Sequence, residues 1–550
     1  MAWKFEDSKT RIGDIVEYNA RELADHTALA YYEYGFEKTF SQFRDICRQV
    51  ANGLMALGVK RGDHIAIWAN NLPQWVYTQF GAPMTGAVLV TVNTNFRAYE
   101  LEYLLDQSDT TTLILTHGVR EADEYLRILR QVCPEVDACS PGDLQTEKLP
   151  YLKNIVHLGE EDIPGMYSWE DMLKLGESIS DAQLDERAAE LDPDDVVMMQ
   201  YTSGTTGYPK GVMLTHANLI GNGQSMAEIM ALTPEDTLCI PVPFFHCFGC
   251  VIGTMCCTVS GATMAPVTAF SAEKVLETVD ALKCTALHGV PTMFIAELEA
   301  MGQKAYDTTH LRTGVMAGST CPVEVMKGVV EKMGAEELTI VYGQTESSPG
   351  ITQTRRDDTM QIRTETVGRA LPNVEVKIVD PATGETLGPG ETGELCSRGY
   401  HIMKGYYKMP EKTNEAIDED GWLHTGDLAS MDEQGNCTIQ GRLKDMIIRG
   451  GENIYPREIE EFLYTHPKIQ DVQVVGIPSQ KYGEEVAAFI RLRNGDQASS
   501  EEVQDFCKDK IAFYKIPRYI YFLDEFPTTA SGKIQKFKLR EIALNHAPEA

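Results

Sequence analysis

The chain has 550 residues, of which 43% are hydrophobic and 24% charged, and 49 basic against 81 acidic side chains give a formal net charge of -32. This length exceeds what one hydrophobic core supports, so we expect two or more domains, and the apolar content excludes a disordered protein. The negative charge repels nucleic acid and anionic membranes at long range, so nucleic acid is not an expected partner.

Helix and strand patterns alternate along the first hundred residues. The apolar spacing predicts, in chain order, a helix over 43–57, a strand over 64–68, a helix over 74–80 and a strand over 87–92. Ser41 is the expected N-cap of the first helix, and Gly58 is its expected stop. The same alternation returns over 238–341. It is typical of layered α/β subdomains with largely parallel sheets.

From about residue 350 the pattern changes to short strands separated by turns. Apolar and polar residues alternate over 374–379, and another short strand is expected over 436–440. Pro-Gly and Asp-Gly pairs mark the turns between such strands. These features predict a small antiparallel β subdomain over about residues 350–440.

A compact α+β unit is expected beyond Gly441. Its predicted elements are a helix over 457–464, strands over 472–476 and 486–492, and a helix that begins at residue 499. Ser499 and Glu502 form the expected capping box of that last helix. We therefore predict an α/β protein with a large N-terminal domain, residues 1–440, and a small C-terminal domain, residues 441–550.

The cysteines and the N-terminus indicate a cytoplasmic protein. The thirteen cysteines are odd in number and lack the spacing of a small secreted disulfide framework. The first residues, MAWKFEDSKTRIGD, show no basic region followed by an apolar run, and no segment approaches 18 uninterrupted apolar residues, so no transmembrane segment is expected. Cys247 and Cys250 form a C-x-x-C, for which a zinc or redox role competes with burial as small apolar side chains.

The stretch YTSGTTGYPKG, residues 201–211, has the composition of an anion-binding loop. Its glycines let backbone N–H groups turn inward and its hydroxyls add donors: Gly204, Gly207 and Gly211, with Thr202, Ser203, Thr205 and Thr206. Lys210 adds a positive charge. Pro209 before the lysine and Gly211 after it rule out a P-loop. A hairpin turn between two apolar strands would also explain the loop.

A second polar stretch, LTIVYGQTES at residues 338–347, continues a predicted strand at the end where open α/β sheets bind ligands. Tyr342 offers a flat face for a base, Thr345 a hydroxyl for a phosphate, and Glu346 a hard oxygen ligand for Mg²⁺. Helix capping by Gln-Thr-Glu-Ser is the alternative interpretation.

Three later stretches add candidate charges. Asp427, in GWLHTGD, can accept hydrogen bonds from two ribose hydroxyls, although a Gly-Asp turn explains it equally well. Residues 441–453, GRLKDMIIRGGEN, place three cations and a glycine pair at the predicted domain boundary, where a charged linker is the alternative. Lys533 follows Ser-Gly in PTTASGKIQK, where a solvated lysine is the alternative.

The conjunction and order of these motifs resemble the adenylate-forming superfamily, and specifically its acyl-CoA synthetases, over about residues 39–540. The resemblance implies a two-step reaction. A carboxylate attacks the α-phosphate of ATP to give an acyl-adenylate and pyrophosphate, and the thiol of coenzyme A then displaces AMP. ATP, Mg²⁺, coenzyme A and a small carboxylic acid are the implied ligands, and the oligomeric state stays open, with a homodimer among the options.

The resemblance also implies roles for individual residues. The 201–211 loop would hold the β- and γ-phosphates. Tyr342, with Gly318 and Ser319, would contact adenine, and Gly343 and Gln344 would make further nucleotide contacts. Thr345 would contact the α-phosphate, and Glu346 would bind Mg²⁺. Asp427 would bind the ribose, with support from Arg442. Lys533 would be the adenylation lysine, whose ammonium relieves repulsion between carboxylate and α-phosphate.

The C-terminal domain of such enzymes rotates between the two half-reactions, so the resemblance implies that residues 441–550 are mobile. Lys444 occupies the hinge position. Gly450 and Gly451 would line the path of the pantetheine arm, where small residues leave room. Ile448 stands where some relatives carry a lysine, so no thioester-step cation is assigned there.

Two segments match the family's acyl-pocket and gating regions: 244–249, with Phe245, His246 and Gly249, and 288–291, with Gly289. Relatives that activate amino acids carry an aspartate in the first region, so Phe245 and His246 indicate an acid without an α-amine. Nearby Phe, Met and Gly residues favour a medium-to-long-chain fatty acid over an aryl acid. His246 is either a gate or a packed core histidine.

Two other functions remain as alternatives. A stand-alone acyl-AMP ligase would pass its adenylate to a separate carrier instead of coenzyme A. A catalytically inactive nucleotide sensor is the alternative outside the enzymes. The joint presence of Lys210, Glu346 and Lys533 argues against the sensor, because a sensor does not need all three.

Overall fold

The computed structural model describes residues 9–119, 121, 123–159, 161–202, 209–318, 321–449, 452–479, 481–493, 495–508, 510–528 and 534–546. The chain divides into two compact units: Met1–Glu375 with Arg398–Gly421, and Val376–Ser397 with Trp422–Ala550. Each contains helices and sheets. The predicted domain boundary near Gly441 falls inside the second unit and stays a prediction.

A nine-stranded sheet lies in the first unit. Its strands are β1 (Thr27–Tyr31), β2 (Phe36–Thr39), β10 (Thr237–Ile240), β11 (Thr263–Pro266), β12 (Ala286–Gly289), β13 (Thr313–Ala317), β14 (Glu337–Gly343), β15 (Gly350–Gln353) and β16 (Arg369–Ala370). Their order is β16-β15-β14-β13-β12-β10-β11-β1-β2. The pairs from β14 to β1 are parallel, and the pairs beyond them at both ends are antiparallel.

An eight-stranded sheet lies in the same unit. Its strands are β3 (His64–Trp68), β4 (Val88–Thr91), β5 (Thr110–Leu115), β6 (Asn154–His157), β7 (Tyr167–Ser168), β8 (Val196–Thr202), β9 (Lys210–Thr215) and β19 (Gly405–Tyr406). Their order is β19-β9-β8-β4-β3-β5-β6-β7. The predicted strand over 64–68 matches β3. All five β3 residues are buried, because helices cover both faces of a mainly parallel sheet.

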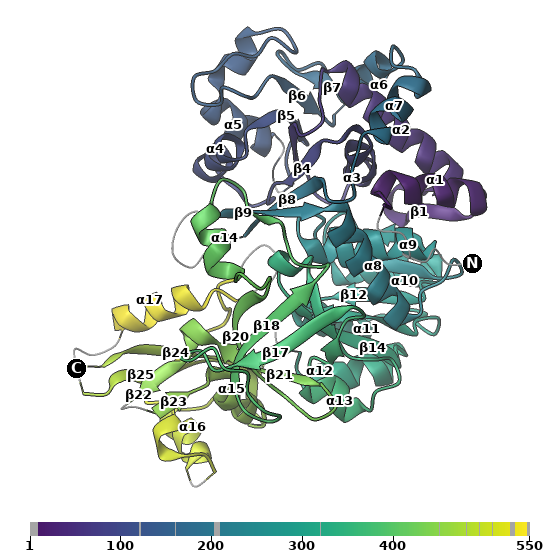
Figure 1. Ribbon diagram of the computed structural model, residues 1–550. Helices are drawn as coiled ribbons and strands as arrows, with labels where there is room; N and C mark the ends of the chain where they lie inside the picture. Colours follow the sequence, from purple (N-terminus) through teal and green to yellow (C-terminus); the bar gives the residue numbers. More distant parts are fainter. Residues whose placement is uncertain are drawn as a thin grey trace. The chain divides into compact units, whose positions relative to one another are not determined.

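Helices α4 (Ala98–Gln107) and α5 (Glu124–Val132) cover one face of this second sheet, and α2 (Phe40–Ala56), α6 (Trp169–Gly176) and α7 (Asp181–Ala189) lie on the other side (Figure 1). On the α5 side, the Trp68 ring of β3 stacks on Tyr125 with ring centroids 3.7 Å apart. The sheet and the α4–α5 side thus share one buried apolar core.

The start of α2 differs from the prediction. Thr39, not Ser41, is its N-cap: the Thr39 hydroxyl accepts from the Gln42 backbone N–H, and the Gln42 side chain accepts from the Thr39 N–H. Thr39 and Ser41 both carry the hydroxyl that an N-cap needs. Gln42 stands three residues after Thr39, so Thr39 forms the reciprocal pair of hydrogen bonds. Gly58, with φ of +85°, follows the end of the helix as expected.

The remaining elements of the first unit pack on these sheets. They are α1 (Ile12–Glu22), η1 (Tyr32–Tyr34), α3 (Pro73–Thr85), η2 (Pro134–Ala138), α8 (His216–Met230), η3 (Phe248–Met255), α9 (Cys256–Ser260), α10 (Ala272–Leu282), α11 (Pro291–Met301), α12 (Val323–Gly328), η4 (Val329–Met333), η5 (Thr345–Ser347), α13 (Met360–Glu365) and α14 (Pro410–Ala416). Of these, η3 and η4 are π-helices.

The second unit contains two further sheets. The four-stranded sheet β17-β18-β20-β21 has strands β17 (Val374–Val379), β18 (Gly393–Gly399), β20 (Leu423–Met431) and β21 (Cys437–Arg442), although β17 begins and β18 ends in the first unit. The other sheet consists of β22 (Ile447–Arg449), β23 (Glu452–Ile454), β24 (Ile469–Ser479), β25 (Gly483–Leu492) and β26 (Tyr519–Phe522), in the order β23-β22-β25-β24 with β26 beside β25.

Helices complete the second unit: η6 (Leu443–Asp445), α15 (Pro456–Tyr464), α16 (Ser500–Cys507), η7 (Phe513–Lys515) and α17 (Lys536–His546). Ser499 caps α16 by accepting from the Glu502 N–H at 3.1 Å. The predicted capping box is only half formed, since the Glu502 carboxylate accepts from Lys468 Nζ at 2.7 Å instead. Among the described residues, no helix is both long and apolar enough to cross a membrane.

Glu297 on α11 is an ionisable side chain whose burial is not offset by a hydrogen bond within the described residues. Its side chain is fully buried, and neither carboxylate oxygen has a hydrogen-bond partner among the described residues. Burial raises the pKa of Glu297 from 4.5 to about 8. The folded state therefore keeps the proton over a range in which the unfolded chain releases it. Its contribution to stability is present below pH 4.5 and is lost as the pH rises through about 8.

We expect Glu297→Gln, which removes the charge and keeps the shape, to flatten this pH dependence. The gain in unfolding free energy over the unaltered protein should be larger at about pH 8.5 than at about pH 5. Urea unfolding at both pH values measures it. Glu299→Gln, on an exposed position of the same helix, is the control and should leave the pH dependence unchanged. An equal effect of Glu297→Gln at both pH values would contradict the assignment.

Candidate active site

The carboxyl ends of four parallel strands bring the predicted residues that follow them to one edge of the nine-stranded sheet, whereas the 201–211 segment belongs to the eight-stranded sheet. β10, β12, β13 and β14 run parallel, with Gly289 opposite Met316 and Ala317 opposite Val341. Gly318 and Tyr342 therefore follow paired residues on neighbouring strands. Open α/β sheets bind ligands at this edge.

Backbone geometry explains two of the predicted glycines. Gly318 has φ of +92°, a conformation that other residues rarely adopt. A Cβ atom on Gly343 would lie 1.8 Å from the Pro349 carbonyl oxygen, so no side chain fits between β14 and the following turn. Tyr342, which directly precedes Gly343, is half-buried. Ser319 lies outside the described residues.

Thr345 and Glu346 lie on the single turn of η5. The Gln344 N–H donates to Ser347 Oγ at 3.1 Å, and Ser347 Oγ donates to the Gln344 carbonyl at 2.8 Å. The predicted alternative, in which these residues cap a helix, thus describes the backbone correctly. Capping occupies Gln344 and Ser347, so the Thr345 and Glu346 side chains take no part in it.

Tyr406, which was not among the predicted site residues, joins Glu346 to Lys210. Strand β19 pairs with β9, with Tyr406 opposite Val212. The Tyr406 hydroxyl donates to Glu346 Oε1 at 2.7 Å, and Lys210 Nζ lies 3.9 Å from the centroid of the Tyr406 ring. A cation over a phenol ring is attracted by the negative face of the ring. One aromatic side chain thus contacts both predicted charged residues.

Burial shifts the pKa values of Lys210 and Tyr406. Burial lowers the pKa of Lys210, and the nearby Glu346 carboxylate acts in the opposite direction. Burial also raises the pKa of the Tyr406 phenol, as does the charge of Glu346. Tyr406 therefore stays protonated at neutral pH and can only donate to the carboxylate.

The YTSGTTGYPKG segment connects two antiparallel strands, as the hairpin interpretation predicted. β8 pairs with β9, and Thr202 is opposite Lys210 at the last pair before the connection. A Cβ atom on Gly211 would lie 2.8 Å from Met199 Sδ. The remaining predicted phosphate-loop residues lie outside the described residues: Ser203, Gly204, Thr205, Thr206 and Gly207.

The predicted acyl segment is fixed by side chains of the neighbouring sheet region. Asn71 accepts from the Phe244 N–H at 2.9 Å and donates to the Val242 carbonyl at 3.0 Å. Thr91 Oγ1 donates to the Phe245 carbonyl at 2.9 Å. A Cβ atom on Gly249 would lie 2.3 Å from the Pro243 carbonyl oxygen, so this position requires glycine.

The acyl segment lies beside Thr345. Cys247 Sγ is 3.9 Å from Thr345 Oγ1 and 3.8 Å from His246 Nδ1. His246 is half-buried, and its Nδ1 accepts from the Phe248 N–H at 3.2 Å. The segment predicted to contact the acid and the residue predicted to contact the α-phosphate are thus neighbours, as transfer between those two groups requires.

His288 connects the π-helix η3 to the sheet. It is fully buried, its Nε2 donates to the Ile252 carbonyl at 3.0 Å, and its Nδ1 accepts from the Val315 N–H at 3.1 Å. Burial lowers the pKa of His288 to about 4, so the ring is neutral. A Cβ atom on the adjacent Gly289 would lie 2.9 Å from the Phe294 ring.

The cysteines of the C-x-x-C pair have the features of buried small apolar side chains, the alternative to a zinc or redox site. Cys247 and Cys250 are buried, and burial raises the pKa of the Cys250 thiol well above its ordinary value. Cys250 Sγ accepts from Gln200 Nε2 at 3.0 Å and lies 3.7 Å from Met198 Sδ. These contacts are those of a packed core side chain.

In the second unit, Asp427 and Arg442 are opposite each other on β20 and β21. Arg442 Nε lies 3.2 Å from Asp427 Oδ1, and the Asp427 N–H donates to Thr425 Oγ1 at 3.1 Å. Ile448 on β22 is 51% exposed. The backbone of Lys444 lies in η6, whereas its side chain is outside the described part, as are Gly450, Gly451 and Lys533.

Comparison with known families decides the class of the protein. Residues 16–407 match the model of the AMP-binding enzyme family, and residues 458–533 match the model of the AMP-binding enzyme C-terminal domain. The chain belongs to the AMP-binding enzyme family. This confirms the predicted adenylate-forming superfamily.

Named relatives, which match nearly the whole chain, confirm the predicted class of AMP-forming acid–thiol ligases. The chain is 56% identical to "Putative acyl-CoA synthetase YngI" of Bacillus subtilis over 96% of each chain. It is 40% identical to "Medium-chain acyl-CoA ligase ACSF2, mitochondrial" of Homo sapiens over 99% of this chain and 89% of that one.

Solved structures confirm the predicted fold class. The anthranilate CoA ligase AuaEII, in complex with anthranoyl-AMP, is similar with a TM-score of 0.86 and 29% identity, over 98% of this chain and 99% of that one. ATP-bound MatB of Rhodopseudomonas palustris is similar with a TM-score of 0.81 and 25% identity, over 97% and 99%.

Proposed function

We propose that the chain is an ATP-dependent ligase that activates a medium-to-long-chain fatty acid as its acyl-adenylate and transfers the acyl group to coenzyme A, releasing pyrophosphate and AMP. The contact between Cys247 in the acyl segment and Thr345 carries the proposal, since it brings the acid-binding and phosphate-binding segments together. A cytoplasmic location remains a prediction of the sequence.

In the first unit, Tyr342 and Gly318 would hold adenine and Thr345 would contact the α-phosphate. Lys210, at the edge of the 201–211 connection, would neutralise the β- and γ-phosphates. Glu346 fits Mg²⁺, because its buried carboxylate is a hard oxygen ligand that Tyr406 holds in place by one hydrogen bond. When bound, Mg²⁺ supplies additional neutralisation of phosphate charge.

In the second unit, Asp427 would accept the ribose hydroxyls, with Arg442 orienting its carboxylate at 3.2 Å. Lys533 would stabilise the charge that accumulates as the acid attacks the α-phosphate. We retain Lys444 as the hinge between residues 1–440 and 441–550, and Gly450 and Gly451 as the pantetheine path.

The relatives favour the shorter part of the predicted chain-length range, because a 40% identical relative is named a medium-chain ligase. An aryl acid is the second candidate, because a 29% identical solved relative is an anthranilate CoA ligase. Phe245 and Gly249 agree with a flat or an extended apolar tail alike. The absence of a carboxylate at 245 and 246 supports an acid without an α-amine in both cases.

Rates of acyl-CoA formation over a series of acids test the proposal. We expect kcat/KM to peak at a straight-chain acid of medium length, from a series between butanoate and hexadecanoate, and to exceed the value for benzoate and anthranilate by at least about 10-fold. A maximum at benzoate or anthranilate would establish the aryl-acid alternative. Thioester formation with none of the acids would refute the proposed function.

Tyr406→Phe tests the contact that positions Glu346. The variant keeps the ring beneath Lys210 and removes the hydroxyl that donates to Glu346 Oε1. Hydrogen bonds to charged groups contribute about 1.5–3 kcal/mol, so we expect kcat/KM to fall by at least about 10-fold. The Mg²⁺ concentration for half-maximal rate should rise.

Tyr407→Phe is the matched control, since it removes a hydroxyl that donates to Asp109 Oδ2 at 2.8 Å. It should leave the Mg²⁺ dependence unchanged. If both variants behave alike, Tyr406 has no specific effect on Glu346.

A further inference from the structure

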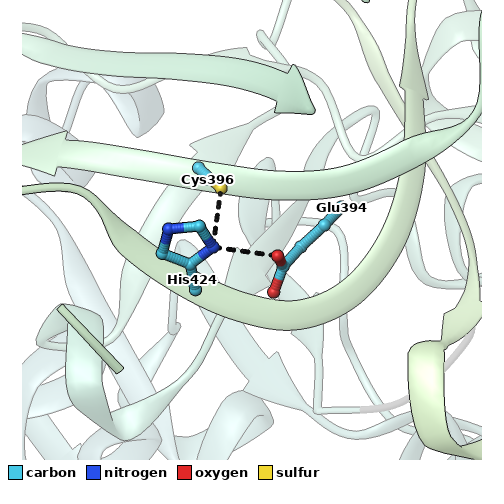
Figure 2. A group of neighbouring side chains, drawn as sticks. All are labelled: Glu394, Cys396 and His424. Carbon is cyan, nitrogen blue, oxygen red and sulfur yellow. Dashed lines mark hydrogen bonds and ion pairs between the residues drawn. The ribbon is translucent and has the colours of Figure 1, made fainter. Parts of the chain in front are cut away.

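Three side chains able to bind a metal gather in the second unit, on residues with no role in the proposed reaction. Glu394 and Cys396 are alternate residues of β18, and His424 is opposite Cys396 on β20. Alternate residues of a strand point to the same face. Figure 2 shows the three side chains pointing toward one another between these two strands.

The sulfur and nitrogen ligand atoms lie at the spacing that a tetrahedral cation requires, and the nitrogen–oxygen pair, now joined by a hydrogen bond, is slightly closer than the roughly 3.3 Å that two bonds of about 2.0 Å give. His424 Nδ1 is 2.9 Å from Glu394 Oε2 and 3.5 Å from Cys396 Sγ, and the three atoms all lie within 4.8 Å of one another. Zinc bonds of about 2.3 Å to sulfur and about 2.0 Å to nitrogen place a sulfur and a nitrogen ligand about 3.5 Å apart in a tetrahedron. The sulfur–nitrogen distance already has this value.

The surroundings favour binding. Cys396 is buried, the Glu394 side chain is 12% exposed and the His424 side chain is 33% exposed, so a cation can approach past the histidine. The second oxygen, Glu394 Oε1, accepts from the Gly426 N–H at 2.9 Å. This hydrogen bond keeps Oε2 directed toward His424, as outer contacts of metal ligands do.

We propose that Glu394, Cys396 and His424 bind one divalent cation of the zinc class, with water as the fourth ligand. A thiolate and an imidazole select zinc over Mg²⁺ and Ca²⁺, which prefer oxygen ligands. On binding, the Cys396 thiol loses its proton to solvent and the neutral His424 ring carries its proton on Nε2 instead of Nδ1, so affinity should fall as the pH falls.

The cation would link β18 to β20 at the point where the pairing register of these two strands shifts. The strand register changes between the Glu394–Leu428 pair and the Cys396–His424 pair, as at a β-bulge, and Asp427 lies within that stretch. Because the unfolded chain does not present the three ligands together, binding should raise the unfolding midpoint.

Titration of the metal-free protein with Co²⁺ alone tests the proposal. A Co²⁺–thiolate bond gives a near-ultraviolet charge-transfer absorption that oxygen ligands such as Glu346 do not give. We expect this band to saturate at about one Co²⁺ per chain and to disappear when Zn²⁺ is added. Cys396→Ser should lose the band.

Cys437→Ser is the matched control, because Cys437 is buried in the neighbouring strand β21 of the same sheet. It should keep the band. His424→Ala alters a partly exposed side chain, so it tests the site even if Cys396→Ser does not fold, and it should weaken Co²⁺ binding at least about 10-fold. Absence of the band from the unaltered protein, or its persistence in Cys396→Ser, would overturn the proposal.

Discussion

Lys533→Ala is expected to slow acyl-adenylate formation by about 10²–10³-fold, the effect of removing one preorganised group that stabilises developing charge. The acid and the α-phosphate are both anionic, and an ammonium between them is worth most in the transition state. Single-turnover formation of acyl-adenylate and pyrophosphate measures this step. The second half-reaction, started from synthetic acyl-AMP and coenzyme A, should change much less.

Lys538→Ala is the control for this prediction, because Lys538 is exposed and lies close by in the sequence. It should leave both half-reactions unchanged. Adenylate formation by Lys533→Ala within a few-fold of the unaltered rate would show that another group neutralises the attack. Equal loss in both half-reactions would indicate that the variant is damaged more generally.

Glu346→Gln is the second change with a large expected effect. It removes the negative charge from a buried carboxylate that accepts from Tyr406 at 2.7 Å, and an amide is a much weaker ligand for Mg²⁺. We expect kcat to fall by about 10²-fold at fixed Mg²⁺ and to recover in part at higher Mg²⁺.

Steady-state rates over a range of Mg²⁺ concentrations separate weaker Mg²⁺ binding from a lower maximal rate. Glu277→Gln alters a half-buried side chain of α10 that forms an ion pair with Lys304 at 3.0 Å, and it should behave like the unaltered protein. If Glu346→Gln has the same Mg²⁺ dependence as the unaltered protein, the metal is bound by other residues.

Local patterns in the sequence predicted individual elements where the apolar spacing is regular. Strand β3 is five consecutive buried residues followed by a turn, and it was predicted at its observed bounds. The cap of α2 was misplaced, because Ser41 and Thr39 are both capable caps and only the position of Gln42 distinguishes them. The π-helix η3 was not predicted, since apolar spacing within 248–255 does not reveal a change in backbone hydrogen bonding.

The candidate site depends more on contacts between distant segments. Lys210, Thr345 and Glu346 were predicted because they stand in recognisable motifs. Tyr406 was missed, because its importance comes from the pairing of β19 with β9, which joins residues far apart in the chain. The Gly-Tyr pair before Lys408, which could have marked a short edge strand, was the available signal.

The same limit applies to the cluster of Glu394, Cys396 and His424. Glu394 and Cys396 stand in an ordinary alternating strand, and His424 precedes the motif that drew attention to Asp427. Strand register brings His424 opposite Cys396, and register between segments this far apart cannot be read from local composition.

The most direct test of the proposed function is the stoichiometry of products from ATP, Mg²⁺ and a medium-chain acid, with and without coenzyme A. With coenzyme A, we expect AMP, pyrophosphate and acyl-CoA in equal amounts over many turnovers. Without it, pyrophosphate should stop at about one equivalent per chain, because the adenylate stays bound. Continuous pyrophosphate release without coenzyme A would instead establish an acyl-AMP ligase, and formation of ADP would contradict an adenylate-forming reaction altogether.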